Sequence, residues 1–178
     1  MLVVLVSLSR YCSINCLSCF SHAPIFTHQH TLTHALIKPT GAAFNYGALE
    51  DAGITHIVSV SPSIGEVYPQ EFEYFLVFDT DDADENPQDD SLEKFFGATY
   101  DFIHDAKAQG GKVLVVCDDG ISYSPVILAA FLMREEGMYR SDAMHRIKRQ
   151  RTTMSLSALH QNDLKVLEKK LINEGVID

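Results

Sequence analysis

The chain has 178 residues, of which 46% are hydrophobic, and a chain of this size can bury one full core. Its formal net charge of −10 argues against nucleic acid or an anionic membrane surface as partner, because both are bound through a basic face. No run of about eighteen or more apolar residues occurs, so the sequence predicts no membrane span. The acidic excess lies in residues 1–93, which have two basic and thirteen acidic side chains, whereas residues 94–178 have twelve and eleven.

Residues 1–31 differ from the rest of the chain and are predicted to form a flexible N-terminal extension. Their apolar start, residues 2–8, is too short to span a membrane and no positively charged residue precedes it, so a secretory signal is not the preferred interpretation. We expect instead an extension that is lipidated on cysteine or docked on a partner, in a cytoplasmic protein whose thiols are reduced. A zinc or iron–sulfur site is a weaker alternative, and we expect neither a metal nor a cofactor. The ligands of such a metal site would be Cys12, Cys16, Cys19 and His22.

Residues 32–173 are predicted to form a single α/β domain without internal repeats or linkers. Apolar runs predict strands, and helical spacing of apolar residues predicts helices. Because strands and helices alternate, the expected fold is a mostly parallel central sheet flanked by helices. The strands are expected at residues 35–37, 55–60, 74–78 and 112–116, and the helices at 42–52, 92–108, 125–136, 142–151 and 158–173.

The strongest indication of function is the segment VLVVCDDGISYSP, residues 113–125. Its first four residues are valine or leucine, as in a strand that is buried on both faces. Ser124 and Pro125 favour a helix start, with Ser124 as the N-cap. The residues from Cys117 to Tyr123 would then join a strand to a helix N-terminus, where free N–H groups and the helix dipole favour an anion and a thiolate. This arrangement suits cysteine-based phosphoryl transfer.

This segment resembles the signature of the cysteine-based protein tyrosine phosphatases, H-C-x5-R-S, in the G-x-S-R-S form of dual-specificity phosphatases. Cys117 stands at the place of the nucleophile, whereas Val116 replaces the histidine and Tyr123 replaces the arginine. The similarity extends over about residues 32–171, through GITHIVSVS, FEYFLVFDTD and AAFLMREEGM. The resemblance implies the dual-specificity phosphatase fold and a phosphate-binding loop. The loop would comprise Cys117, Asp118, Asp119, Gly120, Ile121, Ser122 and Tyr123.

The missing arginine decides the functional prediction. In the family that the chain resembles, a guanidinium holds two phosphoryl oxygens and neutralises charge, and the hydroxyl of Tyr123 cannot supply that charge. Asp118 and Asp119 place negative charge beside the anion site and oppose binding further. Cys117 keeps the place of the nucleophile and Ser124 that of a family serine, and we expect both to be vestiges of a catalytic site.

Two other residues are candidates for acid–base roles. The resemblance places Asp81 at the position of the general acid, but Asp81 is one of eight acidic residues in residues 79–93, a segment that is either a solvated loop or a surface for a basic partner. The resemblance aligns His160 with a phenylalanine and Asp163 with a glutamine. His160 could replace a missing base, but its place in an amphipathic helix favours a surface or half-buried position.

We therefore expect a pseudophosphatase, a catalytically inactive protein of the dual-specificity phosphatase type that acts as a protein-binding or scaffold module. It resembles the phosphoserine/threonine/tyrosine-interacting proteins, which keep the arginine and lose the cysteine, whereas this chain does the reverse. The expected partner is a protein, either basic or phosphorylated. Two alternatives remain open: a weakly active phosphatase that uses Cys117 with Asp81, and a structural subunit of a larger assembly.

Overall fold

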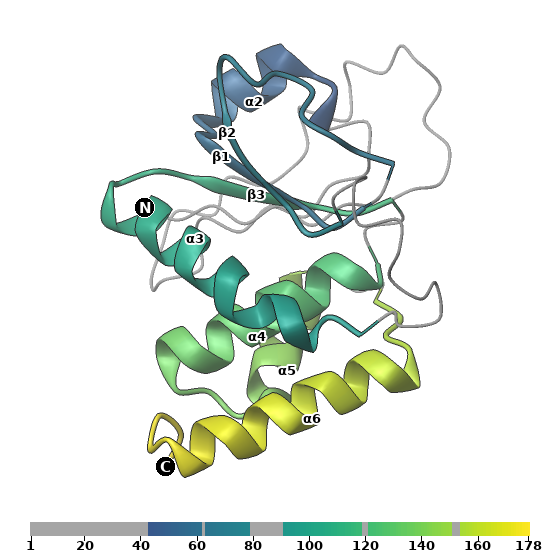
Figure 1. The fold of residues 1–178 in the computed structure, drawn as a ribbon, viewed down its shortest axis with the longest axis vertical. Helices are drawn as coiled ribbons and strands as arrows, with labels where there is room; N and C mark the ends of the chain where they lie inside the picture. Colours follow the sequence, from purple (N-terminus) through teal and green to yellow (C-terminus); the bar gives the residue numbers. More distant parts are fainter. Residues whose placement is uncertain (1–42, 62, 79–90, 119–120, 151–153) are drawn as a thin grey trace.

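The computed structural model describes residues 43–61, 63–78, 91–118, 121–150 and 154–178. Their strands form a parallel sheet in the order β2-β1-β3, with β1 at His56–Ser59, β2 at Glu73–Leu76 and β3 at Val113–Val116. Helix α2 (Tyr46–Ala52) covers one face of the sheet, and α3 (Phe96–Ala108), α4 (Tyr123–Glu136), α5 (Arg140–Gln150) and α6 (Ala158–Asn173) lie on the other side (Figure 1). A 3-10 turn, η2 (Glu93–Phe95), precedes α3. The predicted fold class is confirmed.

The two inner strands and α4 form the centre of the core. All four residues of β1 and all four of β3 are buried, as expected for parallel strands that are covered on both faces. In α4, residues 124–133 are all buried, because this helix packs against β3 and against α3, α5 and α6. Burial of such apolar side chains is the main favourable term in folding. No helix in the described parts of the chain is both long and apolar enough to cross a bilayer.

All five predicted helices are found, and the first begins later than predicted. The Asn45 side chain accepts a hydrogen bond from the backbone N–H of Ala48 at 3.1 Å, so Asn45 is the N-cap of α2. This cap interrupts the helix predicted over residues 42–52, and α2 starts only at Tyr46. The helix predicted at 92–108 opens with the 3-10 turn η2. The strand predicted at residues 35–37 lies outside the described residues.

A buried carboxylate ties α6 to the chain in front of α3. Asp163 is 2% exposed, and its two oxygens accept hydrogen bonds from Ser91 Oγ and from the backbone N–H of Leu92, both at 3.0 Å. Leu92 lies at the start of η2, where backbone donors have no partner within the helix. Asp163 therefore satisfies a buried donor and determines where the chain enters α3.

A second carboxylate joins α3 to α4. Glu135 accepts hydrogen bonds from Tyr100 Oη at 3.1 Å, from His104 Nδ1 at 3.1 Å and from the ammonium group of Lys107. Burial alone would raise the pKa of Glu135, but the hydrogen bonds from Lys107, His104 and Tyr100 together lower this pKa below its ordinary value. The ionised carboxylate is therefore favoured by the folded state.

Because folding lowers the pKa of Glu135, its stabilising effect is present at neutral pH and is lost as the pH falls below the ordinary glutamate value and through the lowered one. Glu135→Gln should lower the free energy of unfolding at neutral pH by about 1 kcal/mol. The difference from wild type should shrink as the pH falls below the ordinary glutamate pKa and through the lowered one. Urea denaturation at several pH values checks this, with the exposed Glu174 changed to Gln as the control. A difference that is independent of pH would contradict the prediction.

Candidate functional site

The candidate site lies where β1 and β3 end beside each other. The backbone N–H of Val60 donates to the carbonyl of Val116 at 2.7 Å, so the two strand ends are held together. Ser61 follows on the β1 side, and Cys117 and Asp118 follow on the β3 side. The carboxyl ends of parallel strands are the usual place for ligands in open α/β sheets.

Cys117 is fully buried and faces the start of α4. Its Sγ atom lies 2.9 Å from Ser124 Oγ, and it accepts a hydrogen bond from the backbone N–H of Ser124 at 3.4 Å. That N–H belongs to the first turn of α4, where donors have no helical partner. The site thus holds a cysteine sulfur outside any disulfide at a helix N-terminus, whose dipole favours a thiolate whereas the full burial of the sulfur opposes one.

The helix after the loop begins earlier than the sequence predicts. Tyr123 is the first residue of α4 and Ser122 is its N-cap, without a side-chain capping bond. The predicted N-cap, Ser124, is therefore wrong, and the reason is that its hydroxyl lies against the sulfur of Cys117. Pro125 falls in the first turn of the helix, where its missing N–H breaks no helical hydrogen bond.

Tyr123, at the place where the related signature has arginine, belongs to a line of aromatic rings. Its ring centroid is 6.0 Å from that of Phe78 and 4.8 Å from that of His160, with both pairs edge-on. Phe78 also meets Phe95 at 5.9 Å. The four rings of Phe95, Phe78, Tyr123 and His160, which we call the aromatic row, connect the segment before α3, the residues after β2, the start of α4 and α6. Edge-on pairs of this kind add about 0.5–1.5 kcal/mol each beyond the burial of their surface.

His160 is buried, with 3% of its surface exposed, so the predicted surface or half-buried position is wrong. It lies in the first turn of α6, where its backbone N–H donates to the N-cap Ser157 Oγ at 3.2 Å. Its ring packs against Tyr123. Spacing of apolar residues could not find this contact, because histidine counts as polar. The available signal was the alignment of His160 with a phenylalanine of the family.

Asp118 is exposed, and its carboxylate is held by the neighbouring strand end. Ser61 Oγ donates to Asp118 Oδ1 at 2.7 Å and accepts from the backbone N–H of Ser63 at 3.0 Å. A fixed negative charge therefore lies next to Cys117 in the chain. The far side of the loop is fixed by Ser155, whose backbone N–H donates to the carbonyl of Ile121 at 3.0 Å.

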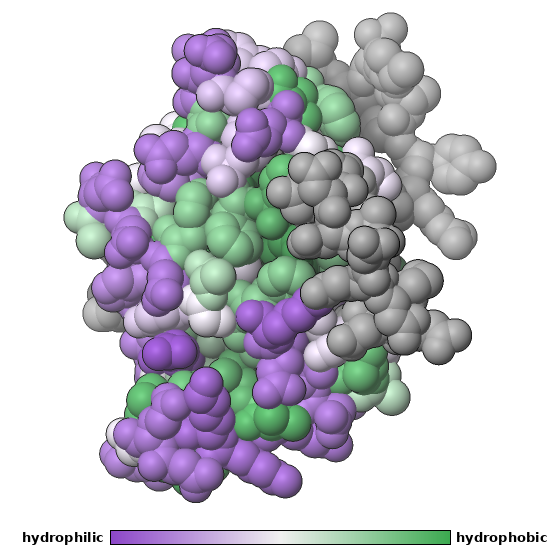
Figure 2. Space-filling view, in the orientation of Figure 1, coloured by the Kyte–Doolittle hydropathy of each residue, from purple (hydrophilic) through white to green (hydrophobic). Residues whose placement is uncertain are grey.

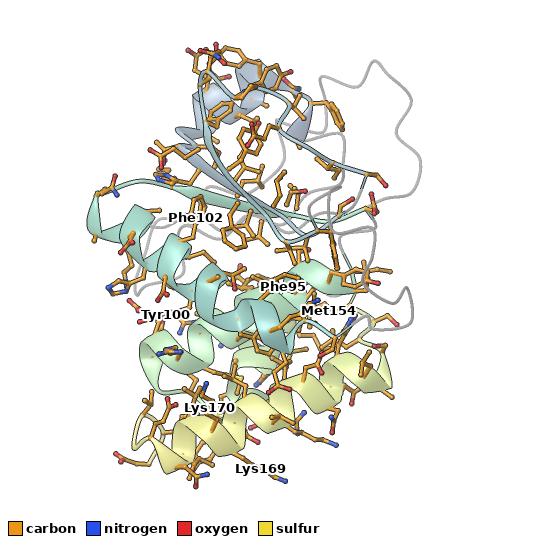
Figure 3. All side chains as sticks on the ribbon, in the orientation of Figure 1. Phe95, Tyr100, Phe102, Met154, Lys169 and Lys170 are labelled. Atoms are coloured by element: carbon orange, nitrogen blue, oxygen red, sulfur yellow. The ribbon has the colours of Figure 1, made fainter. Side chains whose placement is uncertain are left out.

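Several predicted site residues lie outside the part of the chain that the structure describes. The candidate general acid Asp81 and the loop residues Asp119 and Gly120 lie outside the described residues. The same holds for the cysteines and histidine of the possible N-terminal metal site. Met154, which begins the segment after α5, packs against the core cluster that includes Cys117 (Figure 3).

The described residues of the site come from several elements. They are Cys117, Asp118, Ile121, Ser122, Tyr123, Ser124 and, from other elements, Ser61, Phe78 and His160.

The family model described as dual specificity phosphatase, catalytic domain, matches residues 41–170. Dual specificity protein phosphatase 1 of Arabidopsis thaliana is 38% identical over 130 residues, which are 73% of this chain and 63% of that protein. A probable rhodanese domain-containing dual specificity protein phosphatase of Dictyostelium discoideum is 34% identical over 118 residues, which are 61% of this chain and 24% of that protein. This chain thus spans less than two thirds of the length of either relative.

Two solved structures have a similar fold. The human tyrosine phosphatase-like serine/threonine/tyrosine-interacting protein is 28% identical with a TM-score of 0.67, and the match covers 76% of this chain and 91% of that chain. A mouse putative dual specificity phosphatase, complexed with zinc tungstate, is 27% identical with a TM-score of 0.68, and the match covers 79% and 85%. The family resemblance stated from the sequence is confirmed.

The contact between Tyr123 and His160 should be measurable as a coupling energy. We expect Tyr123→Ala to lower the free energy of unfolding by about 2 kcal/mol, because the change removes a half-buried ring that packs against Phe78 and His160. Tyr123→Phe keeps the ring and should lower the free energy of unfolding by less than half of that amount. In a double-mutant cycle with His160→Ala, urea denaturation should give a coupling of about 1 kcal/mol. Strict additivity of the two alanine changes would show that the rings do not stabilise each other.

Proposed function

Because the chain belongs to the dual-specificity phosphatase family, we propose that it is a catalytically inactive member that acts by binding another protein. The observation that carries this proposal is Tyr123 at the place of the family's arginine. Its side chain is neutral, and its ring packs against Phe78 and His160. A guanidinium holds two oxygens of a phosphoryl group at once, which a tyrosine cannot do. At other phosphoryl-transfer sites, supplying an arginine changes the rate by roughly 10³–10⁵.

Charge and burial around the loop support the same proposal. The carboxylate of Asp118 is anchored by Ser61 one residue from Cys117, and it would repel a dianion. Val116, at the place of the family's histidine, is buried in the apolar cluster that includes Ile57 and Leu114. The described loop therefore offers an anion no side-chain cation. Backbone N–H groups at the start of α4 would be its main donors.

The comparisons support a binding role for this scaffold. One solved protein of similar fold is described as tyrosine phosphatase-like and as an interacting protein. We propose a similar use here, with a partner that is basic or phosphorylated. We further propose that residues 32–173 form the binding domain, that residues 1–31 are an extension, and that the protein works in the cytoplasm.

A weakly active phosphatase is the second candidate. It is favoured by the two contacts from Ser124 to the sulfur of Cys117, which would stabilise a thiolate nucleophile. Asp81 would be the general acid in this mechanism. The two candidates differ in whether Cys117 forms a bond to phosphorus, and a hydrolysis assay separates them.

We predict no measurable hydrolysis of an aryl phosphate or of phosphopeptides beyond the rate of a Cys117→Ser control. The physical reason is that the loop from Cys117 to Tyr123 has no cationic side chain to neutralise the charge of the transferred group. The assay should use wild type and control at equal, high protein concentration. Turnover that is clearly above the control and abolished by Cys117→Ser would promote the phosphatase candidate.

The substitution Tyr123→Arg, which places a guanidinium in the loop, should restore anion binding without restoring good turnover. Two charge-assisted hydrogen bonds, together worth about 1.5–3 kcal/mol because Asp118 competes for the guanidinium, would make tungstate bind roughly tenfold to a hundredfold more tightly to Tyr123→Arg than to wild type. Tyr123→Gln, which is neutral, is the control for loss of the ring. Adding Asp118→Asn to Tyr123→Arg should tighten binding again, because the carboxylate competes for the guanidinium.

Calorimetric titration measures each dissociation constant, and thermal unfolding shows which variants remain folded. Equal binding by the Arg and Gln variants would mean that position 123 does not face the anion.

A further inference from the structure

The outer edge of β2 has backbone groups that no strand pairs with in the described part of the chain. Glu73 and Val77 donate their N–H groups to carbonyl oxygens of the β1 segment, at 3.0 and 2.9 Å. Backbone groups of a parallel strand alternate in direction from residue to residue. The N–H and C=O groups of Tyr74 and Leu76 therefore point away from β1, toward the open side.

β2 is short and begins with the charged Glu73, but beyond Glu73 it has no other feature that normally protects an exposed strand. Such edges usually contain a lysine, a proline, a bulge or an inward-pointing charge. The residues from Tyr74 to Phe78 include none of these residue types, and Tyr74, Phe75 and Leu76 are each half-buried. Figure 2 shows hydrophobic residues gathered on this face, over the strands between α2 and α3. The apolar part of this edge, from Tyr74 to Leu76, offers a surface for another strand.

Helix α3 provides an apolar surface beside the edge of β2. Phe102 extends from α3 toward the sheet (Figure 3), and its ring centroid is 5.6 Å from that of Phe75 and 5.4 Å from the ring of His56. Phe75 and Phe102 are both half-buried. An added strand would place every second side chain on this side of the sheet, against the two phenylalanine rings.

The surroundings of the edge are acidic. Glu66, Glu71 and Glu73 are exposed in residues 61–78, a segment without lysine or arginine. Asp101 and Asp105 are exposed on α3. Such a surface attracts a basic segment and repels a second copy of this chain, whose net charge is −10.

We propose that the open edge of β2 docks an extended, basic segment of a partner protein, in which apolar side chains alternate with Lys or Arg. The segment adds a strand to the sheet through the outward groups of Tyr74 and Leu76. Its apolar side chains pack toward Phe75 and Phe102, and its basic ones, on the opposite face of the added strand, meet the exposed Glu66 and Glu71. This inference rests on the proposed protein-binding function, but it does not depend on the loss of catalysis.

The test uses the full chain, labelled with nitrogen-15, and the acetylated peptide amide Lys-Val-Lys-Val-Lys-Val-Lys as the probe. Titration should shift the amide signals of Glu73 to Leu76 most strongly and slow hydrogen exchange at Tyr74 and Leu76. The peptide Glu-Val-Glu-Val-Glu-Val-Glu should bind at least tenfold more weakly. Raising the salt concentration should weaken the binding of the lysine peptide, because exposed charges are screened over about 8 Å at physiological ionic strength.

A matched pair of variants separates main-chain pairing from side-chain contact. Leu76→Pro removes one outward N–H and leaves the N–H groups that face β1, so the lysine peptide should bind it at least tenfold more weakly. Leu76→Ala keeps that N–H and should weaken binding less than about threefold. If Leu76→Pro does not fold, the same question is answered on the peptide side. A probe that is N-methylated at its valines leaves the protein unchanged and should bind at least tenfold more weakly.

Four results would overturn the proposal: no binding at millimolar peptide, largest shifts away from β2, equal binding of the two peptides, or equal binding of Leu76→Pro and Leu76→Ala. Self-association of the free chain through β2, seen by sedimentation, would assign the edge to a second copy instead. Failure here leaves the hydrolysis assay of Cys117 unaffected. Conversely, an active phosphatase would still have this edge, so the two proposals fail separately.

Discussion

The packing of α4 on β3 is the contact on which the rest of the structure depends. β3 is buried along its whole length, and ten consecutive residues of α4, 124–133, are buried with it. Cys117 lies where the two elements meet, and it is held there by Ser124 of the helix. Cys117 and the start of α4 are therefore held together by contacts within the protein, without any contribution from a bound anion. Apolar burial maintains this scaffold, so a loss of catalytic chemistry need not cost the fold.

This separation of fold and chemistry explains how Tyr123 can take the place of an arginine. An arginine at the first turn of α4 would be useful for its charge, whereas the tyrosine is useful for its ring. The aromatic row joins four segments that are far apart in the sequence, from Phe78 through Phe95 and Tyr123 to His160. Each contact replaces exposure of an aromatic surface to water by an edge-on ring pair. The described ring at this position packs against its neighbours, which fits the proposed loss of anion binding.

The sequence predicted those parts of the fold that depend on local patterns. The run of valines in β3, the spacing of buried residues in α3 at Phe96, Thr99, Ile103 and Ala106, and the alternation of strands and helices were sufficient for the α/β class. Local patterns failed where a side chain has a tertiary partner. Ser124 looks like a helix cap but contacts a sulfur, and His160 looks like a surface residue but contacts a ring. These partners are distant in the chain or set by loop geometry, which no spacing rule reports.

The site and the β2 edge are physically connected through one short segment. Phe78 lies two residues beyond the end of β2 and packs against Tyr123 at the start of α4. Val77, between them, is buried and is held to the β1 side by its N–H group. A strand docked on β2 would restrain the same chain that supports the ring of Tyr123. An effect of docking on the loop, if measured, would therefore require no long pathway, because three consecutive residues, Leu76, Val77 and Phe78, span the distance along the chain.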